Sequence, residues 1–326
     1  MNGKHSNRVV LAGGNGFLGQ MLARTLQASG KEVIVLTRHP PAEQAEISQV
    51  QWDGGTLGPW TSYLEGAHAI VNLSGRSVNC RYNPHNRRLI MDSRIDSTRV
   101  LGEAIAECKQ APLVWLNSST ATIYKHSLLK PMDEANGEIG ATPEAKDAFS
   151  VEVACEWEKS LDMARTPLTR KVAMRTAMVL GTAKGSVFDV LRRLTRFGLG
   201  GRMGNGQQFV SWIHEEDFCR VVDWLISKTE LAGPVNVCAP TPVTNKQLML
   251  ELRNSCGAPF GLPATRWMLE VGAFLLRTET ELIIKSRCVT PGVLLASGFK
   301  FRFPNVPEAL QDLCARSTVT RTHTNF

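Results

Sequence analysis

Long apolar runs are missing from this sequence. No segment approaches the ~18 uninterrupted apolar residues of a membrane-spanning helix, and the polar opening, residues 1–8, contains no apolar signal region. We therefore expect no contact with a membrane and a cytoplasmic location. With 43% hydrophobic residues among 326, the chain still has enough apolar side chains for a large core, in one domain or in two closely joined ones.

Cysteine spacings typical of metal or redox sites are also missing. None of the eight cysteines belongs to a C-x-x-C pair, and none has a histidine at metal-ligand spacing. The sequence therefore predicts free, mostly buried thiols, and neither a disulfide framework nor a metal site.

A basic tail is absent, although the net charge is +7. The basic residues are scattered, and no nucleic-acid recognition motif accompanies them. We expect solvated faces and a site for an anionic small molecule, with no nucleic-acid partner.

The most informative stretch that is present is a glycine turn. Residues 9–11 form a short apolar run, typical of a strand buried on both faces. A G-x-x-G-x-x-G pattern and helical spacing follow, so a diphosphate can approach backbone N–H groups at a helix N-terminus. The alternative is a tight turn that only packs a helix on a strand, and the strand–turn–helix context favours the nucleotide. The predicted nucleotide contacts in this turn are Gly13, Asn15, Gly16, Phe17, Leu18 and Gly19.

The end of the second predicted strand, residues 32–37, favours NADP over NAD. An NAD site usually places an acidic residue there, yet residues 33–42 contain neither Asp nor Glu. Thr37 is followed instead by Arg38, whose guanidinium can bind a 2′-phosphate. A solvated arginine that opens the next loop is the alternative.

Two further predicted strands end in residues that suit a cofactor cleft. After residues 50–52, Asp53 stands where adenine contacts are common, and a turn aspartate is an equal alternative. The strand at 69–73 runs into a Ser-Gly pair, and ligands of doubly wound sheets bind at such carboxyl ends. We predict that the cofactor contacts Leu73, Ser74 and Gly75.

Polar residues recur on the next two elements. A helix over 84–108 places Arg87, Arg94 and Thr98 on one face, which is either a polar rail along the cleft or the solvent side of the helix. A buried strand at 113–116 then leads into the hydroxyl-rich stretch 117–124. Its hydroxyls can bind a substrate oxygen beside a cofactor, or they can form Ser/Thr turns that satisfy loop backbone.

With these stretches in place, the chain resembles the extended short-chain dehydrogenase/reductase superfamily, in the atypical branch of sugar-nucleotide epimerase-like proteins with a C-terminal domain of unknown function. The resemblance implies an α/β fold, a Rossmann-type doubly wound parallel sheet with a smaller C-terminal α+β substrate domain. It also implies NADP(H) as cofactor, with Ser118 among its contacts. The segments that carry the resemblance are residues 12–19, 71–75, 93–98, 118–124, 198–201, 212–217 and 298–303.

In that superfamily a Ser/Thr, a Tyr and a Lys support hydride transfer, and Thr120 matches the Ser/Thr position. The Y-x-x-x-K pair is missing, because residues 149–154 contain neither residue and none of the three tyrosines has a lysine four positions on. A phenylalanine cannot transfer a proton. Tyr124 is then the candidate substitute acid/base, assisted by Thr120 or Arg94.

Two functions follow as hypotheses. One is an NADP-dependent oxidoreductase or epimerase-like enzyme for a small polar substrate, a sugar-like one included. The other is a non-catalytic NADP(H)-binding sensor or scaffold. By analogy with the superfamily, the helix at 84–108 is also a candidate homodimer contact, whichever function holds. The predicted layout is a cofactor domain of residues 1–185 plus 212–240, a substrate and lid domain of 186–211 and 241–315, and a disordered polar tail of 316–326.

Overall fold

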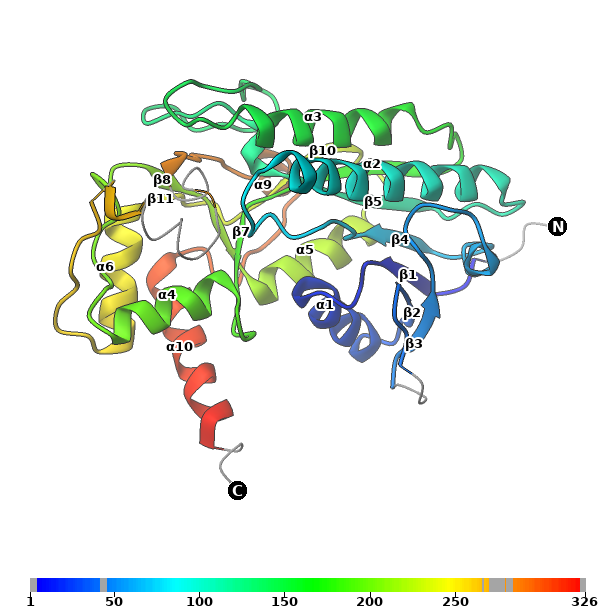
Figure 1. Cartoon of the computed structure of the whole chain (residues 1–326). Coiled ribbons are helices and arrows are strands. Elements are labelled where there is room, and N and C mark those ends of the chain that lie inside the picture. The colour runs from blue at the N-terminus through cyan, green and yellow to red at the C-terminus, as the bar shows by residue number, and fades with distance from the viewer. Residues whose placement is uncertain (1–4, 42–45, 266, 270–278, 280–283, 323–326) are drawn as a thin grey trace.

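The computed structural model describes residues 5–41, 46–265, 267–269, 279 and 284–322, with side chains up to Ser317. A seven-stranded sheet, in which every neighbouring pair is parallel, forms its centre (Figure 1). The strand order is β10-β6-β5-β4-β1-β2-β3. This order confirms the predicted Rossmann-type fold. The strands are β1 (Arg8–Ala12), β2 (Glu32–Thr37), β3 (Ser48–Gln51), β4 (Ala69–Asn72), β5 (Val114–Thr120), β6 (Arg170–Thr176) and β10 (Gly233–Val237).

Helices cover both faces of this sheet, which explains why its strands are apolar on both sides. Successive residues of β1 enter different cores: Val9 packs toward α1 (Phe17–Ala28) and α5 (Glu215–Ser227), and Val10 packs toward α2 (Pro84–Glu107) and α3 (Ala148–Met163). In Figure 1, α2 and α3 lie on one side of the sheet and α1 and α5 on the other.

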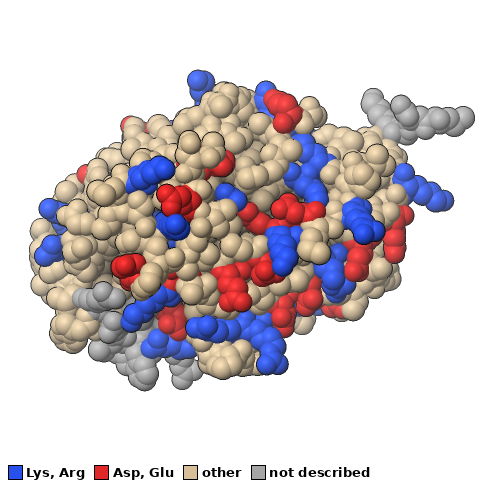
Figure 2. Space-filling view, turned by 90° about the horizontal axis from the view of Figure 1, so that it is seen from above, with Lys and Arg blue, Asp and Glu red and all other residues tan. Residues whose placement is uncertain are grey.

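The α2–α3 side of the molecule carries both signs of charge. Figure 2 shows basic and acidic side chains interspersed over it. Some of them form ion pairs within one helix, such as Arg99 with Glu103 at 2.8 Å and Lys159 with Glu156 at 3.2 Å. Pairs of this exposed kind contribute little to stability. This face therefore presents no continuous patch of one sign.

The order of the strands places a crevice beside β1. The chain passes from β1 through α1 to β2 on one side, whereas β4 pairs with the other side of β1. Ligands of doubly wound sheets bind at the carboxyl ends of the strands where the order reverses in this way. The glycine turn and the Ser74-Gly75 pair both lie at that edge.

Smaller elements extend the fold beyond the sheet (Figure 1). Several of them share a separate core, in which side chains of α4, α6 and α10 pack together. In the described part of the chain, no helix combines the length and the apolar character needed to cross a membrane. The predicted division into a cofactor domain and a substrate and lid domain stays a prediction. These elements are η1 (Pro59–Tyr63), η2 (Ala121–Ile123), β7 (Met178–Leu180), α4 (Val187–Arg196), β8 (Phe209–Val210), β9 (Trp212–His214), β11 (Val243–Thr244), α6 (Asn245–Cys256), α9 (Gly292–Ala296) and α10 (Val306–Thr322).

Some boundaries differ from those predicted. The prediction of a disordered tail from residue 316 is wrong as far as Thr322, because α10 continues to that residue. Residues 323–326 lie outside the described part. Arg316 explains the difference, since it pairs with Glu215 at 2.8 Å and so holds α10 against α5. The sequence also predicts a helix at 263–285, and most of these residues lie outside the described part.

The sequence predicts a helix that starts at Trp212, but Trp212–His214 form strand β9 and α5 starts only at Glu215. The Asp217 carboxylate accepts hydrogen bonds from two backbone N–H groups, that of Arg302 at 2.9 Å and that of Phe303 at 2.8 Å. Two of the stretches noted in the sequence, 212–217 and 298–303, are therefore partners in space.

His214 completes this junction. Its Nδ1 accepts from the Glu216 N–H, its Nε2 lies 3.1 Å from Asp312, and its ring stacks on Phe303. The imidazole is fully buried. Burial lowers the pKa of His214 from 6.5 to about 4, against the attraction of Asp312.

We expect this histidine to weaken the fold in acid. The unfolded chain binds its proton from about pH 6.5 and the folded chain only near pH 4, so stability falls between these values by up to about 1.4 kcal/mol per pH unit. Urea unfolding across this window should give a flatter pH dependence for His214→Gln than for the exposed control His39→Gln. Equal slopes in both variants would assign the acid sensitivity to other groups.

Candidate functional site

The glycine turn after β1 is packed closely on two sides. Gly13 has a φ of +76°, and a Cβ there would lie 2.8 Å from the Cα of Ser74. A Cβ on Gly19 would overlap the backbone of Gly14. The two glycines thus let the turn rest on the β4 loop and let α1 approach the sheet.

Gly16 serves a different purpose, because its surroundings are open. The nearest atom to a Cβ at this position would be the Gly13 oxygen, 3.9 Å away. Gly16 is the N-cap of α1, has no side chain to cap the helix, and is followed by no acid in the first turn. The first amides of α1 consequently face an open space that suits an anion.

The end of β2 meets this turn. Asn15 Nδ2 donates to the Thr37 hydroxyl at 2.7 Å, which joins the glycine turn to β2. Arg38 follows with an exposed side chain, and no acid among the described residues pairs with it. A cation is therefore held beside the turn without a counter-ion in the described chain.

The carboxylate of Asp53, the predicted adenine contact, accepts hydrogen bonds from residues of its own turn. Its carboxylate accepts from the N–H groups of Gly55 and Thr56 at 2.8 and 2.9 Å and from the Thr56 hydroxyl. The Thr56 hydroxyl is the main reason that the pKa of Asp53 is lowered to about 2. The geometry is that of an Asx turn, and an adenine contact stays a prediction.

A buried amide pair supports the carboxyl ends of β4 and β5. Asn72 Nδ2 donates to Asn117 Oδ1 at 2.8 Å, and Asn72 Oδ1 accepts from the Ser74 N–H at 3.0 Å. The Ser74 hydroxyl is buried, and no partner among the described residues satisfies it. The loop with Leu73, Ser74 and Gly75 is thus fixed against the glycine turn, with one polar atom left for a ligand.

Arg94 is the residue that sequence reasoning undervalued. Its guanidinium carbon would lie 3.2 Å from a Cβ on Gly75 and lies 5.0 Å from the Trp157 ring, and Nη1 donates to the carbonyls of Arg76 and Ile90. Burial lowers its pKa to about 10. No acid in the described chain pairs with it, so a largely buried cation stands next to the β4 loop.

The predicted polar face of α2 is therefore divided. Arg94 and Thr98 point toward the sheet, where Thr98 is fully buried and accepts from Trp157 Nε1 at 3.1 Å. Arg87 is exposed and donates to the Tyr82 carbonyl. Helical spacing alone could not separate them, since all three share one face in projection.

The hydroxyl-rich stretch belongs to the strand itself, because β5 continues to Thr120. Thr120 is half-buried, and its hydroxyl accepts from the Thr122 N–H at 3.1 Å. No acceptor among the described residues takes the proton of this hydroxyl. Ser118 is half-buried as well, and its carbonyl accepts from Asn117 Nδ2.

Tyr124 is enclosed. Its side chain is 2% exposed, and its hydroxyl donates to Asn236 Oδ1 and accepts from Arg175 Nη1, both at 2.9 Å. Burial raises the pKa of Tyr124, which Arg175 only partly offsets. The role of acid/base stays a prediction for this residue, and its surroundings are those of a structural junction.

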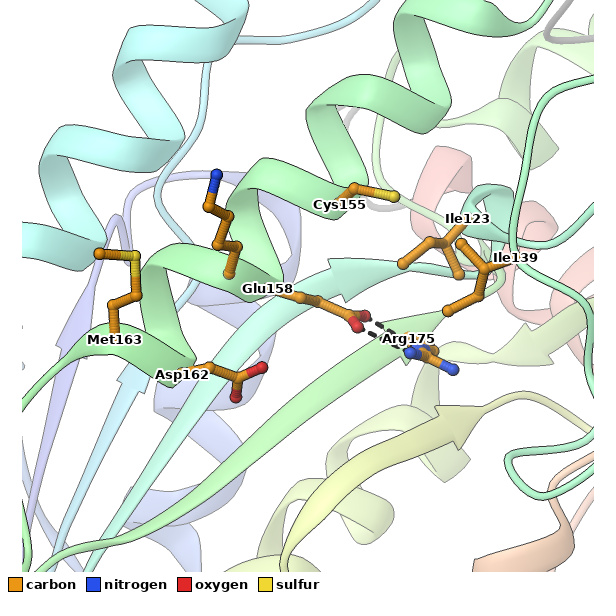
Figure 3. A pocket seen from close by; sticks show the side chains of 8 residues that line it. Ile123, Ile139, Cys155, Glu158, Asp162, Met163 and Arg175 are labelled. Carbon is orange, nitrogen blue, oxygen red and sulfur yellow. Dashed lines mark hydrogen bonds and ion pairs between the residues drawn. The ribbon is translucent and has the colours of Figure 1, made fainter.

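Arg175 leads from Tyr124 to the surface. It binds Glu158 of α3 through two hydrogen bonds of 2.7 and 2.8 Å, and Figure 3 shows this pair in a pocket of about 550 Å³ beside α3. Ser119 also donates to Glu158, at 2.6 Å. The pocket is lined from α3, not from the glycine turn.

Apolar side chains stand where a Y-x-x-x-K pair is expected. Phe149 and Val153 of α3 pack with Ile90 of α2, and the Tyr82 ring meets Phe149 edge to face at 5.0 Å. The described part of α3 offers no proton-transfer group on this cluster. Buried apolar side chains therefore occupy the positions of the missing motif.

Comparisons with known proteins agree with this geometry. The model of the NAD dependent epimerase/dehydratase family matches residues 9–238, which include the whole sheet and both motif loops. The chain belongs to this family. A second model, for a domain of unknown function (DUF1731), matches residues 264–313.

Relatives within the epimerase/dehydratase family span the whole chain. The epimerase family protein SDR39U1 of Bos taurus is 30% identical over 314 residues, covering 94% of this chain and 100% of the relative. YfhF of Bacillus subtilis, also an epimerase family protein, is 31% identical over 313 residues, covering 95% and 99%.

Solved structures of similar proteins share the fold. The crystal structure of the human epimerase family protein SDR39U1 with NADPH has a TM-score of 0.80 and 26% identity, covering 94% of this chain and 99% of that one. MoeE5 in complex with UDP-glucuronic acid and NAD has a TM-score of 0.75 at 16% identity, covering 96% and 99%. The second likeness supports the fold alone.

Proposed function

We propose that this protein binds NADP(H) across the carboxyl ends of β1 and β4. The observation that carries the proposal is the open, uncapped N-terminus of α1 at Gly16, with the cation of Arg38, which no described acid pairs with, one strand away. The amides would hold the diphosphate and Arg38 the 2′-phosphate. The human relative crystallised with NADPH supports this choice of cofactor.

We further propose an epimerase-like oxidoreductase that acts on a small polar substrate. Bound NADP(H) supplies hydride transfer as its own chemistry. Thr120 would orient the reacting oxygen, because its hydroxyl retains a free proton at the end of β5. Arg94 would add positive field at the β4 loop. The similar structure of a nucleoside-diphosphate sugar epimerase from Corynebacterium glutamicum, 25% identical, supports a sugar-like substrate.

A non-catalytic NADP(H)-binding protein is the second candidate. The buried side chains of Phe149 and Val153 favour it, because neither can donate a proton at the positions of the missing pair. The two candidates share the cofactor site and differ in whether bound NADPH is consumed.

Cofactor choice gives a sharp test. We expect Arg38→Asp to weaken NADPH binding about 10- to 100-fold, because charge-assisted bonds to one phosphate are lost. NADH binding should stay within a factor of three, on the order of 0.6 kcal/mol. Calorimetric titration of both nucleotides measures this, with Arg24→Asp on exposed α1 as the matched control. Equal loss for NADPH and NADH would contradict the role of Arg38.

Turnover separates the two candidates. Stopped-flow absorbance of bound NADPH, mixed with aldehydes, ketones and nucleotide sugars, should show oxidation, and Thr120→Ala should slow it about 100-fold. Tyr124→Phe should preserve the rate but lower stability by roughly 1–3 kcal/mol, because Asn236 and Arg175 lose a buried partner. A rate loss in Tyr124→Phe that matches Thr120→Ala would restore Tyr124 as the acid/base. No oxidation with any compound would favour the non-catalytic protein.

A further inference from the structure

Two cysteines meet between helices far from the cofactor edge. Cys256, the last residue of α6, and Cys314 of α10 bring their sulfurs to 3.6 Å, although they are 58 residues apart. Leu252 and Leu310, from the same two helices, share the surrounding core. Neither cysteine is in a disulfide, and both are only partly buried. A disulfide needs about 2.05 Å, and the end position of Cys256 before Gly257 is the one best able to move.

The charges around the pair favour a thiolate on Cys256. A hydrogen bond from Cys314 lowers the pKa of Cys256 to about 7, helped by Arg196 and Arg192 of α4 and opposed by burial. Arg192 is buried, and its Nε has no hydrogen-bond partner among the described residues. The same contact raises the pKa of Cys314. One sulfur is thus prepared to attack and its neighbour remains protonated.

We propose that Cys256 and Cys314 form an oxidisable dithiol, a modification site whose oxidant is a hydroperoxide and whose product is a disulfide that joins α6 to α10. The Cys256 thiolate attacks one peroxide oxygen, the O–O bond breaks, and the leaving hydroxide takes a proton to become water. The Cys314 sulfur then attacks the resulting sulfenic sulfur and displaces a second water. Two thiols and one hydrogen peroxide give one disulfide and two waters.

The other thiols lack this combination. Cys219, Cys238 and Cys288 are buried, and burial raises the pKa of each. Buried, protonated thiols react slowly with peroxide. They therefore serve as internal controls for selectivity.

The site has a mechanical meaning for α10. Cys314 lies between Asp312, which contacts His214, and Arg316, which pairs with Glu215 at the start of α5. A disulfide would add a covalent link to a helix otherwise held by packing and ion pairs. We expect the oxidised protein to unfold at a higher temperature than the reduced one.

The test uses the full chain, fully reduced and then exposed to equimolar hydrogen peroxide. Intact mass should fall by about 2 Da for the two hydrogens lost, and peptide mapping should find Cys256 joined to Cys314. Cys256→Ser should abolish the link and leave Cys314 reduced, Cys314→Ser should leave a sulfenic acid on Cys256 that dimedone traps, and Cys238→Ser should change nothing. The proposal is overturned if both thiols stay equally open to alkylation after peroxide, or if the link joins other cysteines.

A second measurement needs no variant. Iodoacetamide labelling of the reduced wild-type protein, followed by peptide mass, should reach half its maximal rate at Cys256 near the pH of its pKa, about 7. Labelling at Cys219 should stay far slower over the same range. A Cys256 rate that rises only above pH 8.5, as for an ordinary thiol, would contradict the thiolate.

Discussion

Replacing Gly16 with valine should weaken NADPH binding at least about 100-fold, or about 2.7 kcal/mol, with little loss of stability. The residue has ordinary extended dihedral angles, φ −74° and ψ 171°, and no atom lies within 3.9 Å of a Cβ there. Valine at a helix N-cap costs no more than about 1 kcal/mol against glycine. The side chain would fill the space proposed for the diphosphate, so binding and folding are separated by one substitution.

Gly55→Val provides the matched control for that experiment. Gly55 also has open space around its Cβ direction, and it lies in the turn that Asp53 caps. We expect unchanged NADPH affinity by calorimetry and an unchanged urea midpoint within error. If Gly16→Val bound NADPH as tightly as Gly55→Val, the glycine turn would not be the diphosphate site.

Replacing Lys285 with methionine should cost about 3–5 kcal/mol of unfolding free energy, because a buried acid would lose its cation. Lys285 is 1% exposed and Asp147 is 0% exposed, and their charged atoms lie 2.5 Å apart. Asp147 is also the N-cap of α3 and accepts from the Thr142 N–H at 2.8 Å. This pair joins the segment after α6 to the start of a sheet-covering helix.

Urea unfolding followed by circular dichroism measures the loss. Lys125→Met supplies the control, since its ion pair with Glu138 is exposed and should change stability by less than about 1 kcal/mol. The double variant Asp147→Asn, Lys285→Met should be more stable than Lys285→Met alone, because no unpaired buried charge is left. A Lys285→Met variant as stable as Lys125→Met would show that water reaches Asp147.

The sheet could be predicted because the residues of its strands indicate that both faces are buried. Residues such as Val9–Leu11 and Ala69–Val71 are apolar in unbroken runs, and burial on both faces of a parallel sheet requires this. The start of α2 could be predicted equally well, because Asn83 caps the helix and Pro84 stands at its first position. Here local sequence and tertiary structure favour the same element.

Elements that depend on distant partners could not be predicted. Strand β9 exists because Trp212–His214 pairs with Met178–Leu180, and nothing within three residues marks it as a strand. The helical residues 316–322 are polar, and the contact of Arg316 with Glu215, from another element, holds this region in place. Sequence patterns record which side chains are apolar, not which partner a polar side chain will find.

The candidate site divides in the same way. The glycine turn is local, so its form could be inferred from spacing alone. The burial of Tyr124 depends on Asn236, 112 residues away, and the inward position of Arg94 depends on Trp157 beneath it. The role of Tyr124 as acid/base therefore stays a prediction, and the sequence could not show the partners that enclose its hydroxyl.

The bonds that Asp217 receives from Arg302 and Phe303, and the ion pair of Glu215 with Arg316, set an order of events during synthesis. About 100 residues separate these partners, so a ribosome adding roughly 5–20 residues per second needs about 5–20 s to deliver the second after the first. During that interval the acidic residues at the start of α5 still lack these partners. Nascent chains stalled before residue 302 should therefore be the ones that chaperones retain.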